Sequence, residues 1–256
     1  MLLKSKISEH QLSLDPTLND AYNAAKLTIF TSSEWHYLMA EKGLGVAGRN
    51  YIYRKVGEAM LNLETDDKDL RKKIIEYLKS KKEVSTIATE HGLNYEREGL
   101  IKFGEQEGLS HILVQRLVLD TDGRCGGTPD GIIVLNESTD GLELNVQTVE
   151  IKCPISFDGY IRAFKCKTPT DLRNEFREWY FQCLHQMDLC GAMDAFFIIY
   201  HPFFKSGQMN IIKFNKLDIV KKTGEGGKTN DFKLINERKQ QAIKIFNETL
   251  KELTNV

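Results

Sequence analysis

Two carboxylates and an ammonium group stand at one end of a predicted β-hairpin near the middle of the chain. Asp130 stands just before the apolar run 132–135. Glu150 and Lys152 lie two positions apart near the end of the second run, residues 142–153. Side chains alternate between the two faces of a strand, so Glu150 and Lys152 share a face and Ile151 points to the other. Such a group of side chains would bind a hard cation and polarise an oxygen beside it.

The segment between the two apolar runs is typical of a turn, because residues 136–141 are polar and end in Asp-Gly. An antiparallel hairpin brings Asp130 near Glu150 and Lys152. Pro154 ends the second strand because proline has no N–H for the ladder. A proline and a glycine on either side of Asp130 constrain its backbone, which suits a fixed ligand. The alternative from these residues alone is a solvated hairpin whose glutamate and lysine form a surface ion pair.

Helical periodicity and short apolar runs alternate along the rest of the chain. The predicted helices cover residues 18–29, a segment that begins at Thr31, and residues 50–63, 92–106, 171–190 and the end of the chain from Asp231. The predicted strands outside the hairpin cover residues 112–119, 195–200 and 209–214. Residues 157–168 and 224–229 are predicted loops, and the charged residues 66–82 are either an exposed helix or a flap. This order predicts an α/β fold with a mixed central sheet flanked by helices, in a single domain.

The composition is that of an ordinary soluble globular protein. The chain has 256 residues, 41% of them hydrophobic and 28% charged, which suffices for one large domain with a core. The net charge of −1 does not exclude nucleic acid, because a basic groove can be balanced by an acidic metal site. We expect no signal peptide and no membrane span. Five cysteines without a C-x-x-C pair predict reduced thiols in a cytosol.

The motif Pro129-Asp130-Gly131 followed by Glu150-Ile151-Lys152-Cys153-Pro154 resembles the core of the PD-(D/E)XK nucleases. The later run 179–187, Trp-Tyr-Phe-Gln-Cys-Leu-His-Gln-Met, resembles one branch of them, the phage recombination exonucleases of the lambda exonuclease and YqaJ type. The similarity extends from about residue 31 to about residue 202. It implies a restriction-endonuclease-like fold, with residues 1–256 as a single nuclease domain.

The resemblance implies a Mg²⁺-dependent exonuclease, with Mn²⁺ as a substitute metal, that degrades one strand of double-stranded DNA from 5′ to 3′ into 5′-mononucleotides. Its role would be phage-type homologous recombination beside a single-strand annealing protein, in the bacterial cytoplasm, as a phage or prophage protein. Members of the family form ring-shaped homotrimers. Two alternatives stay open: a RecB-like or restriction-type nuclease of other polarity, and a DNA-binding module without catalysis. The intact Asp130, Glu150 and Lys152 favour an enzyme.

The resemblance also implies roles for individual residues. Asp130 and Glu150 would hold one or two metal ions, with the main-chain carbonyl of Ile151 as an extra ligand. Lys152 would orient the attacking water. Gln182 matches a glutamine of the family's helix that contacts the site, whereas Leu184 stands where many members have a second glutamine.

Two further predictions concern residues outside the hairpin. Glu96 shares an apolar helical stripe with Leu100 and Phe103, and an acid in such a place tends to be paired, hydrogen-bonded or metal-linked. Tyr95-Glu96 also matches an acid that follows an aromatic residue in the family.

A pocket for a 5′-phosphate is predicted from Ser33, at the start of a helix, and Thr128, two residues before Asp130. Free N–H groups and hydroxyls at a helix start bind anions. Lys26 stands where lambda exonuclease has an arginine of this pocket. The alternative is that Ser33 is a helix cap and Lys26 an ordinary exposed lysine.

Overall fold

The computed structural model describes residues 28–64, 69, 70, 73, 87–109, 112–114, 117–137, 144–205, 207–227 and 229–254. Lys26, nearly all of the helix predicted over residues 18–29 and most of the charged segment 66–82 lie outside the described residues. The turn of the hairpin lies outside them as well.

A five-stranded sheet forms the centre of the fold, in the order β2-β5-β6-β7-β8. Its strands are β2 (Ile112–Val114), β5 (Gly131–Glu137), β6 (Leu144–Lys152), β7 (Asp194–Tyr200) and β8 (Met209–Asn215). Neighbouring strands are antiparallel except β6 and β7, which are parallel. Gly131 lies opposite Val149, so the predicted hairpin is confirmed, and Asp130 stands level with Glu150.

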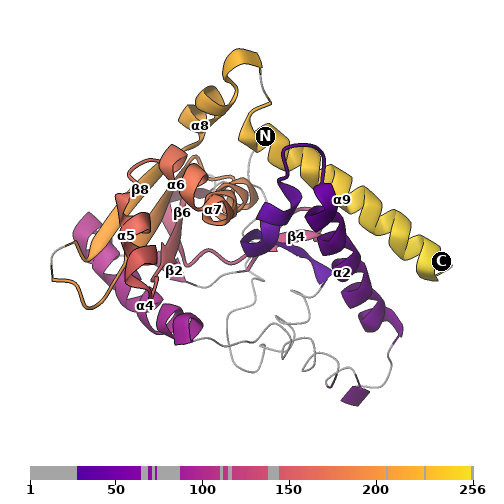
Figure 1. Ribbon diagram of the computed structural model, residues 1–256, viewed down its shortest axis with the longest axis horizontal. Coiled ribbons are helices and arrows are strands. Elements are labelled where there is room, and N and C mark those ends of the chain that lie inside the picture. The colour runs from indigo at the N-terminus through magenta and orange to yellow at the C-terminus, as the bar shows by residue number, and fades with distance from the viewer. Residues whose placement is uncertain are drawn as a thin grey trace.

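Helices cover the sheet and extend beyond it (Figure 1). They are the 3-10 helices η2 (Ser32–Leu38) and η3 (Glu225–Gly227), and the α-helices α2 (Gly45–Glu64), α4 (Ile87–Glu107), α5 (Phe157–Lys165), α6 (Pro169–Glu175), α7 (Arg177–Cys190), α8 (Lys216–Thr223) and α9 (Asp231–Thr254). The long α9 lies along α2. The predicted terminal helix is therefore confirmed, as are the strands predicted over residues 195–200 and 209–214.

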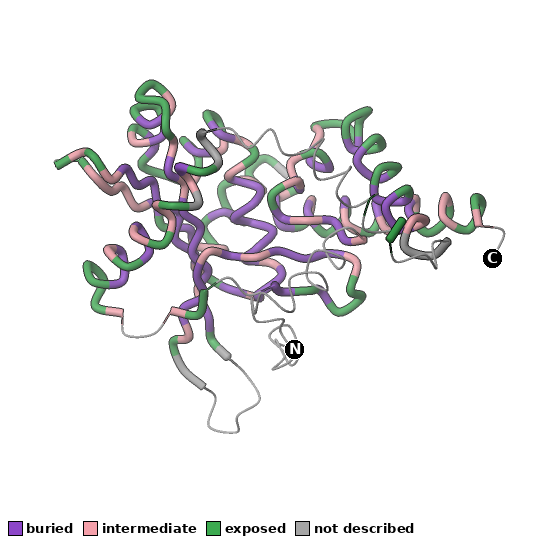
Figure 2. Tube along the Cα trace, turned by 90° about the horizontal axis from the view of Figure 1, so that it is seen from below, coloured by how far each residue is buried: buried purple, intermediate pink, exposed green. Residues whose placement is uncertain are grey.

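Alternation along β6 gives the sheet two different faces. Val149 and Ile151 pack with Phe103 of α4 in one apolar cluster. Val146 packs in a second, larger cluster with residues of α7, and Glu150 points to that same side. Figure 2 shows that buried residues are concentrated in the middle of the molecule, whereas the outer helices carry the exposed ones. The sheet is thus a central layer between α4 and α7.

A small three-stranded sheet holds the segment that leads to Asp130. Its order is β1 (Phe30–Thr31), β4 (Cys125–Gly127) and β3 (Val118–Leu119). β1 and β4 are parallel, with Thr31 beside Gly126. A Cβ atom on Gly127 would lie 2.1 Å from Ser32 Oγ, so glycine is required for this close approach.

Two local predictions between the N-terminus and the hairpin are wrong. Residues 112–119 do not form one strand, because β2 pairs with β5 and β3 pairs with β4 in the other sheet. α2 begins at Gly45 rather than near residue 50 and includes Gly48, since its packing against α9 and η2 outweighs the weak helix propensity of glycine.

Two further corrections follow the hairpin. Residues 157–165 are a helix rather than a loop: the Ser156 hydroxyl accepts a hydrogen bond from the Gly159 amide at the start of α5, and Tyr160 and Ala163 are buried. The helix predicted over residues 171–190 is divided at Phe176, whose φ of −137° and ψ of 70° are not helical. α7 therefore starts at a new axis, which directs it at the face of β6 that carries Glu150.

Candidate active site

The carboxylate of Glu150 is buried and accepts hydrogen bonds from three side chains. Lys152 Nζ lies 2.5 Å from Oε1, and Gln182 Nε2 donates to the same oxygen. Gln186 Nε2 lies 2.7 Å from Oε2. Glu150 is only 2% exposed, and a buried charge is tolerated only where it is paired and hydrogen-bonded. The donors therefore allow an ionised carboxylate to exist at this depth.

The backbone of α7 explains why both glutamines reach the same acid. Gln182 and Gln186 are four residues apart and so lie one above the other on a single face of the helix. Both side chains are buried, at 9% and 1% exposure. Because a carboxylate only accepts hydrogen bonds, the amide NH₂ groups must face Glu150.

Asp130 is held from the backbone side. Its Oδ2 accepts a hydrogen bond of 2.7 Å from the amide of Ile151, which joins the start of β5 to the end of β6. Burial and the charges of Glu150 and Glu96 raise the pKa of the Asp130 carboxyl, and the charge of Lys152 opposes this shift. The site therefore contains more negative charge than one lysine neutralises.

Lys152 and Glu96 complete the charged group. Burial alone would lower the pKa of the Lys152 ammonium, but the carboxylates of Glu150 and Asp130 together raise it, so the lysine is positively charged at neutral pH. Burial raises the pKa of Glu96; Lys152 lowers it and Glu150 raises it. Glu96 acts on the same charges although it belongs to α4, on the other side of the sheet from α7.

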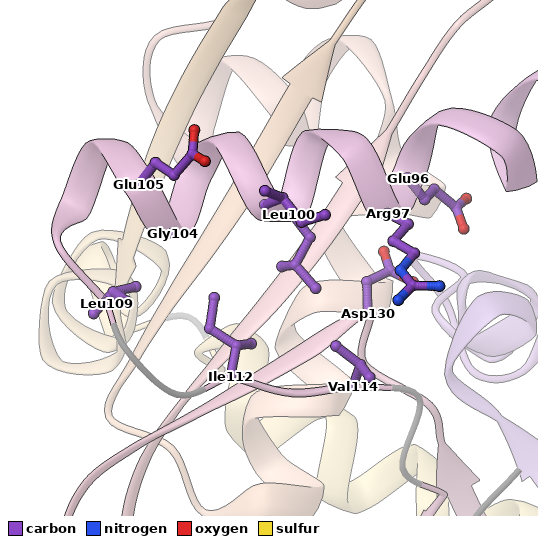
Figure 3. Close-up of a pocket in the computed structure, with 10 residues that line it drawn as sticks. Glu96, Arg97, Leu100, Gly104, Glu105, Leu109, Ile112, Val114 and Asp130 are labelled. Carbon is purple, nitrogen blue, oxygen red and sulfur yellow. The ribbon is translucent and has the colours of Figure 1, made fainter.

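A groove of about 660 Å³ opens beside Glu96 and Asp130. Glu96, Arg97 and Asp130 lie at one end of it, and the apolar Leu109 and Ile112 line the other end (Figure 3). Arg97 is exposed and adds a positive charge at the carboxylate end. The groove thus places one exposed cation beside Glu96 and Asp130, and a third carboxylate, Glu105, lies farther along α4 among apolar side chains.

The donor set fits Mg²⁺. This ion is held by one or two carboxylates, and water and substrate phosphates complete its octahedral shell. Asp130 and Glu150 are such carboxylates. Burial, and after it the charge of Glu150, raises the pKa of Asp130, and a cation would offset the repulsion between the two charges. Within the described part of the chain, no three His, Cys, Asp or Glu side chains converge on one point. Two carboxylates would leave most of the shell of such an ion to water and substrate.

The structure brings together most of the predicted site residues: Asp130, Glu150, Lys152 and Gln182 adjoin one another, and Glu96 interacts electrostatically with them. Ile151 contributes its amide N–H to Asp130, and its carbonyl as a metal ligand stays a prediction. Gln186 was not among the predicted site residues. Its spacing of four residues from Gln182 was the signal that could have identified it.

The predicted phosphate residues are placed in part. Thr31 pairs with Gly126 in parallel strands, so Ser33 and Thr128, each two residues farther on, stand at the same end of that pair. Ser33 is exposed and Thr128 is half-buried. Ser33 is the second residue of η2. Thr31 precedes this helix as its N-cap residue, but its side chain makes no capping hydrogen bond. Lys26 lies outside the described residues.

His185, which lies between the two glutamines along α7, anchors η2. Its Nδ1 lies 2.8 Å from Ser32 Oγ, and its ring stacks on Trp35 with centroids 3.5 Å apart and planes 11° apart. His185 and Ser32 are both buried. The helix that holds Glu150 thus also holds the segment that carries Ser33.

The fold is similar to that of solved exonucleases. The structure is similar to the crystal structure of an alkaline exonuclease, LHK-Exo, from Laribacter hongkongensis, with a TM-score of 0.63, 16% sequence identity and coverage of 92% of this chain and 96% of that chain. LHK-Exo in complex with dAMP matches with a TM-score of 0.61 and 17% identity, at the same coverage. A phage-related exonuclease from Haemophilus somnus matches with a TM-score of 0.56 and 10% identity, over 88% of this chain and 96% of that chain.

No protein-family model and no curated protein sequence matches the chain. At these identities the structural likeness establishes the fold, and the predicted fold of the lambda exonuclease and YqaJ type is confirmed at that level. None of the described helices combines the length and the apolar character that crossing a membrane requires. All five cysteines are described, buried and free of disulfides.

Proposed function

We propose that the protein is a Mg²⁺-dependent exonuclease that degrades one strand of double-stranded DNA from the 5′ end and releases 5′-mononucleotides. The observation that carries this proposal is the buried Glu150 carboxylate, oriented by Lys152, Gln182 and Gln186 directly beside Asp130. The likeness in fold to exonucleases supports it.

The site residues have separate tasks in this proposal. Mg²⁺, or Mn²⁺ in its place, held by Asp130, Glu150 and the carbonyl of Ile151, supplies charge neutralisation for phosphodiester hydrolysis. The two glutamines of α7 fix the rotamer of Glu150, so that one orientation of its carboxylate persists. Lys152 keeps its proton and donates a hydrogen bond to the attacking water. Glu96, with its raised pKa, lies where it can accept a proton near the groove.

Polarity follows from the proposed 5′-phosphate pocket. Ser33 and Thr128 stand at the same end of the β1–β4 pair, and Thr128 is two residues from Asp130. A 5′-phosphate bound by the two hydroxyls and Lys26 would therefore fix the terminal nucleotide relative to the acids. Each cleavage leaves a new 5′-phosphate that can re-enter the pocket.

The biological setting belongs to the same proposal. A nuclease that leaves long 3′ single strands supplies the substrate of a single-strand annealing protein. We therefore propose phage-type homologous recombination in the cytoplasm of a bacterial host, by a homotrimeric enzyme of one domain per chain. The likeness in fold to a phage-related exonuclease supports this setting.

Digestion of end-labelled duplex DNA with Mg²⁺ or with EDTA tests the proposal. We expect a 5′ label to be released at once as a mononucleotide and a 3′-labelled strand to shorten gradually, with no digestion in EDTA. Release of the 3′ label first would indicate the opposite polarity. Internal fragments would indicate an endonuclease, and binding without any product would indicate a non-catalytic DNA-binding protein.

A further inference from the structure

Aromatic side chains gather at the end of the sheet where the C-terminal ends of β6 and β7 lie. They come from three segments: Tyr95 from α4, Phe157 from the first position of α5, and His201 and Phe203 from the turn after β7. The ring centroid of Phe203 lies 5.6 Å from that of Tyr95 and 5.7 Å from that of His201. The ring of Phe157 lies 6.1 Å from that of His201. We call these four residues the aromatic patch.

The patch combines exposed rings with a buried support. Phe203 is 71% exposed and Phe157 is 68% exposed, whereas His201 beneath them is 1% exposed. His201 Nδ1 also accepts a hydrogen bond of 3.4 Å from the amide of Phe203. The two phenylalanines are therefore held by ring contacts and by the backbone, while much of each ring surface stays open to solvent.

The patch is joined to the strand that carries Glu150 and Lys152 by a short length of chain. Lys152 of β6 lies opposite Ile199 of β7 in their parallel register. Phe157 is five residues after Lys152, and Phe203 is four residues after Ile199. Five residues of extended chain span at most roughly 17 Å. Successive phosphates of a strand are about 3.4 Å apart along a duplex, so the patch lies within about five nucleotides of the acids. Tyr95 is also the neighbour of Glu96.

Two exposed cations each stand two residues after a member of the patch in the sequence. Arg97 lines the carboxylate end of the groove beside Asp130, and Lys205 is exposed two residues after Phe203. Nucleic acid in single-stranded form is bound by this combination, in which cations contact phosphates and aromatic rings stack on bases. Stacking tolerates any sequence, because every base presents a π-face.

We propose that the aromatic patch binds unpaired bases of the DNA strand that occupies the acids, so that the preferred ligand is a frayed or single-stranded end of any sequence. This inference rests on the proposed function and adds to it the form of DNA that is bound. A second copy of the chain is the alternative occupant, and sedimentation of the alanine variants tests it.

The binding of a fluorescein-labelled single-stranded oligonucleotide, followed by anisotropy in EDTA, measures the patch without hydrolysis. We expect Phe203→Ala and Phe157→Ala each to weaken binding at least about fivefold, since a base–aromatic stack is lost. Phe203→Trp should restore near wild-type affinity. Leu217→Ala, which removes an apolar side chain that is 65% exposed on α8, is the matched control and should bind like the wild type.

An abasic oligonucleotide separates stacking from charge. It should bind the wild type more weakly than the normal oligonucleotide, and Phe203→Ala should bind it as the wild type does. Equal affinities of wild type and both alanine variants for the normal oligonucleotide would overturn the inference. A Phe203→Ala variant that binds DNA normally but sediments as a smaller assembly would also overturn it and assign the patch to a second copy.

The digestion of end-labelled duplex distinguishes this inference from the proposed function. If the wild type digests DNA but the alanine variants bind it normally, the patch inference fails and the exonuclease stands. If the wild type binds through the patch but never cleaves with Mg²⁺, the exonuclease fails and base stacking stands. Thermal unfolding of each variant shows whether it is folded.

Discussion

Gln186 of α7 donates a hydrogen bond to Glu150 of β6, with 2.7 Å between Nε2 and Oε2. Both residues are almost fully buried, at 1% and 2% exposure. The other end of the amide, Oε1, has no hydrogen-bond partner among the described residues. An amide that leaves its own oxygen unpaired in the interior costs stability, so this glutamine serves the carboxylate rather than the fold.

This relationship predicts a separation between activity and stability in Gln186→Leu. The change removes one donor to Glu150 and also removes the unpaired amide oxygen, so we expect the free energy of unfolding to change by less than about 2 kcal/mol. Loss of the orienting hydrogen bond should lower the rate of hydrolysis about 10- to 100-fold. Single-turnover digestion and urea unfolding measure the two effects. Gln106→Leu, at an exposed position of α4, is the matched control, and a strongly destabilised but fully active Gln186→Leu would contradict the prediction.

Replacement of Glu150 by glutamine tests the metal site. Glu150→Gln keeps the shape of the side chain and removes the ligand charge, so we expect hydrolysis to fall on the order of 10³-fold or more, which corresponds to several kcal/mol of lost charge stabilisation. DNA binding in EDTA should stay within a few-fold of wild type. Glu237→Gln, exposed on α9, should digest DNA normally. Near wild-type turnover in Glu150→Gln would show that the catalytic acid lies elsewhere.

The phosphate pocket predicts a preference for phosphorylated ends. Wild type should digest a duplex with a 5′-phosphate faster than a matched duplex with a 5′-hydroxyl. Ser33→Ala and Lys26→Ala should each reduce that preference about tenfold, since each loses a hydrogen bond or charge contact to a dianion. The exposed Lys42 provides the control variant Lys42→Ala. Equal rates of the wild type on both ends would refute the pocket.

His201 predicts a pH dependence of stability. Burial, followed by the charge of His91, lowers the pKa of His201, so in a window below about pH 6.5 the unfolded chain binds more protons than the folded protein. The contribution of His201 to stability is thus complete above about pH 6.5 and is lost as the pH falls through that window. We expect the unfolding free energy of wild type to fall more steeply from pH 6.5 to pH 5 than that of His201→Phe.

The difference between those two curves isolates His201, because burial also lowers the pKa of His36 and that effect is common to both proteins. Chemical denaturation at fixed ionic strength across this pH range gives the curves. Parallel curves would show that protonation of His201 does not couple to folding.

The hairpin and its charged end were predictable because their determinants are local. Strand alternation places Glu150 and Lys152 on one face wherever the strand lies, and a short polar turn returns the chain so that Asp130 stands level with Glu150. The terminal helix and the strands at residues 195–200 and 209–214 are long, regular apolar patterns of the same kind. A pattern of this type follows from the repeat of the helix or strand itself, so it can be recognised without knowing which element packs against it.

The role of Gln186, the division of residues 112–119 and the aromatic patch depended on tertiary structure, whereas the resemblance had already implied that Gln182 contacts the site. A helix presents Gln182 and Gln186 on one face in any context, but only the packing of α7 against β6 turns that face toward a carboxylate. Ser32 and Ser33 are neighbours of the same type, yet Ser32 is buried against His185 and Ser33 is exposed. Contacts between residues far apart in the chain are set by the closest packing of whole elements. For that reason the sequence determined which groups could catalyse, and the tertiary structure decided which groups hold them.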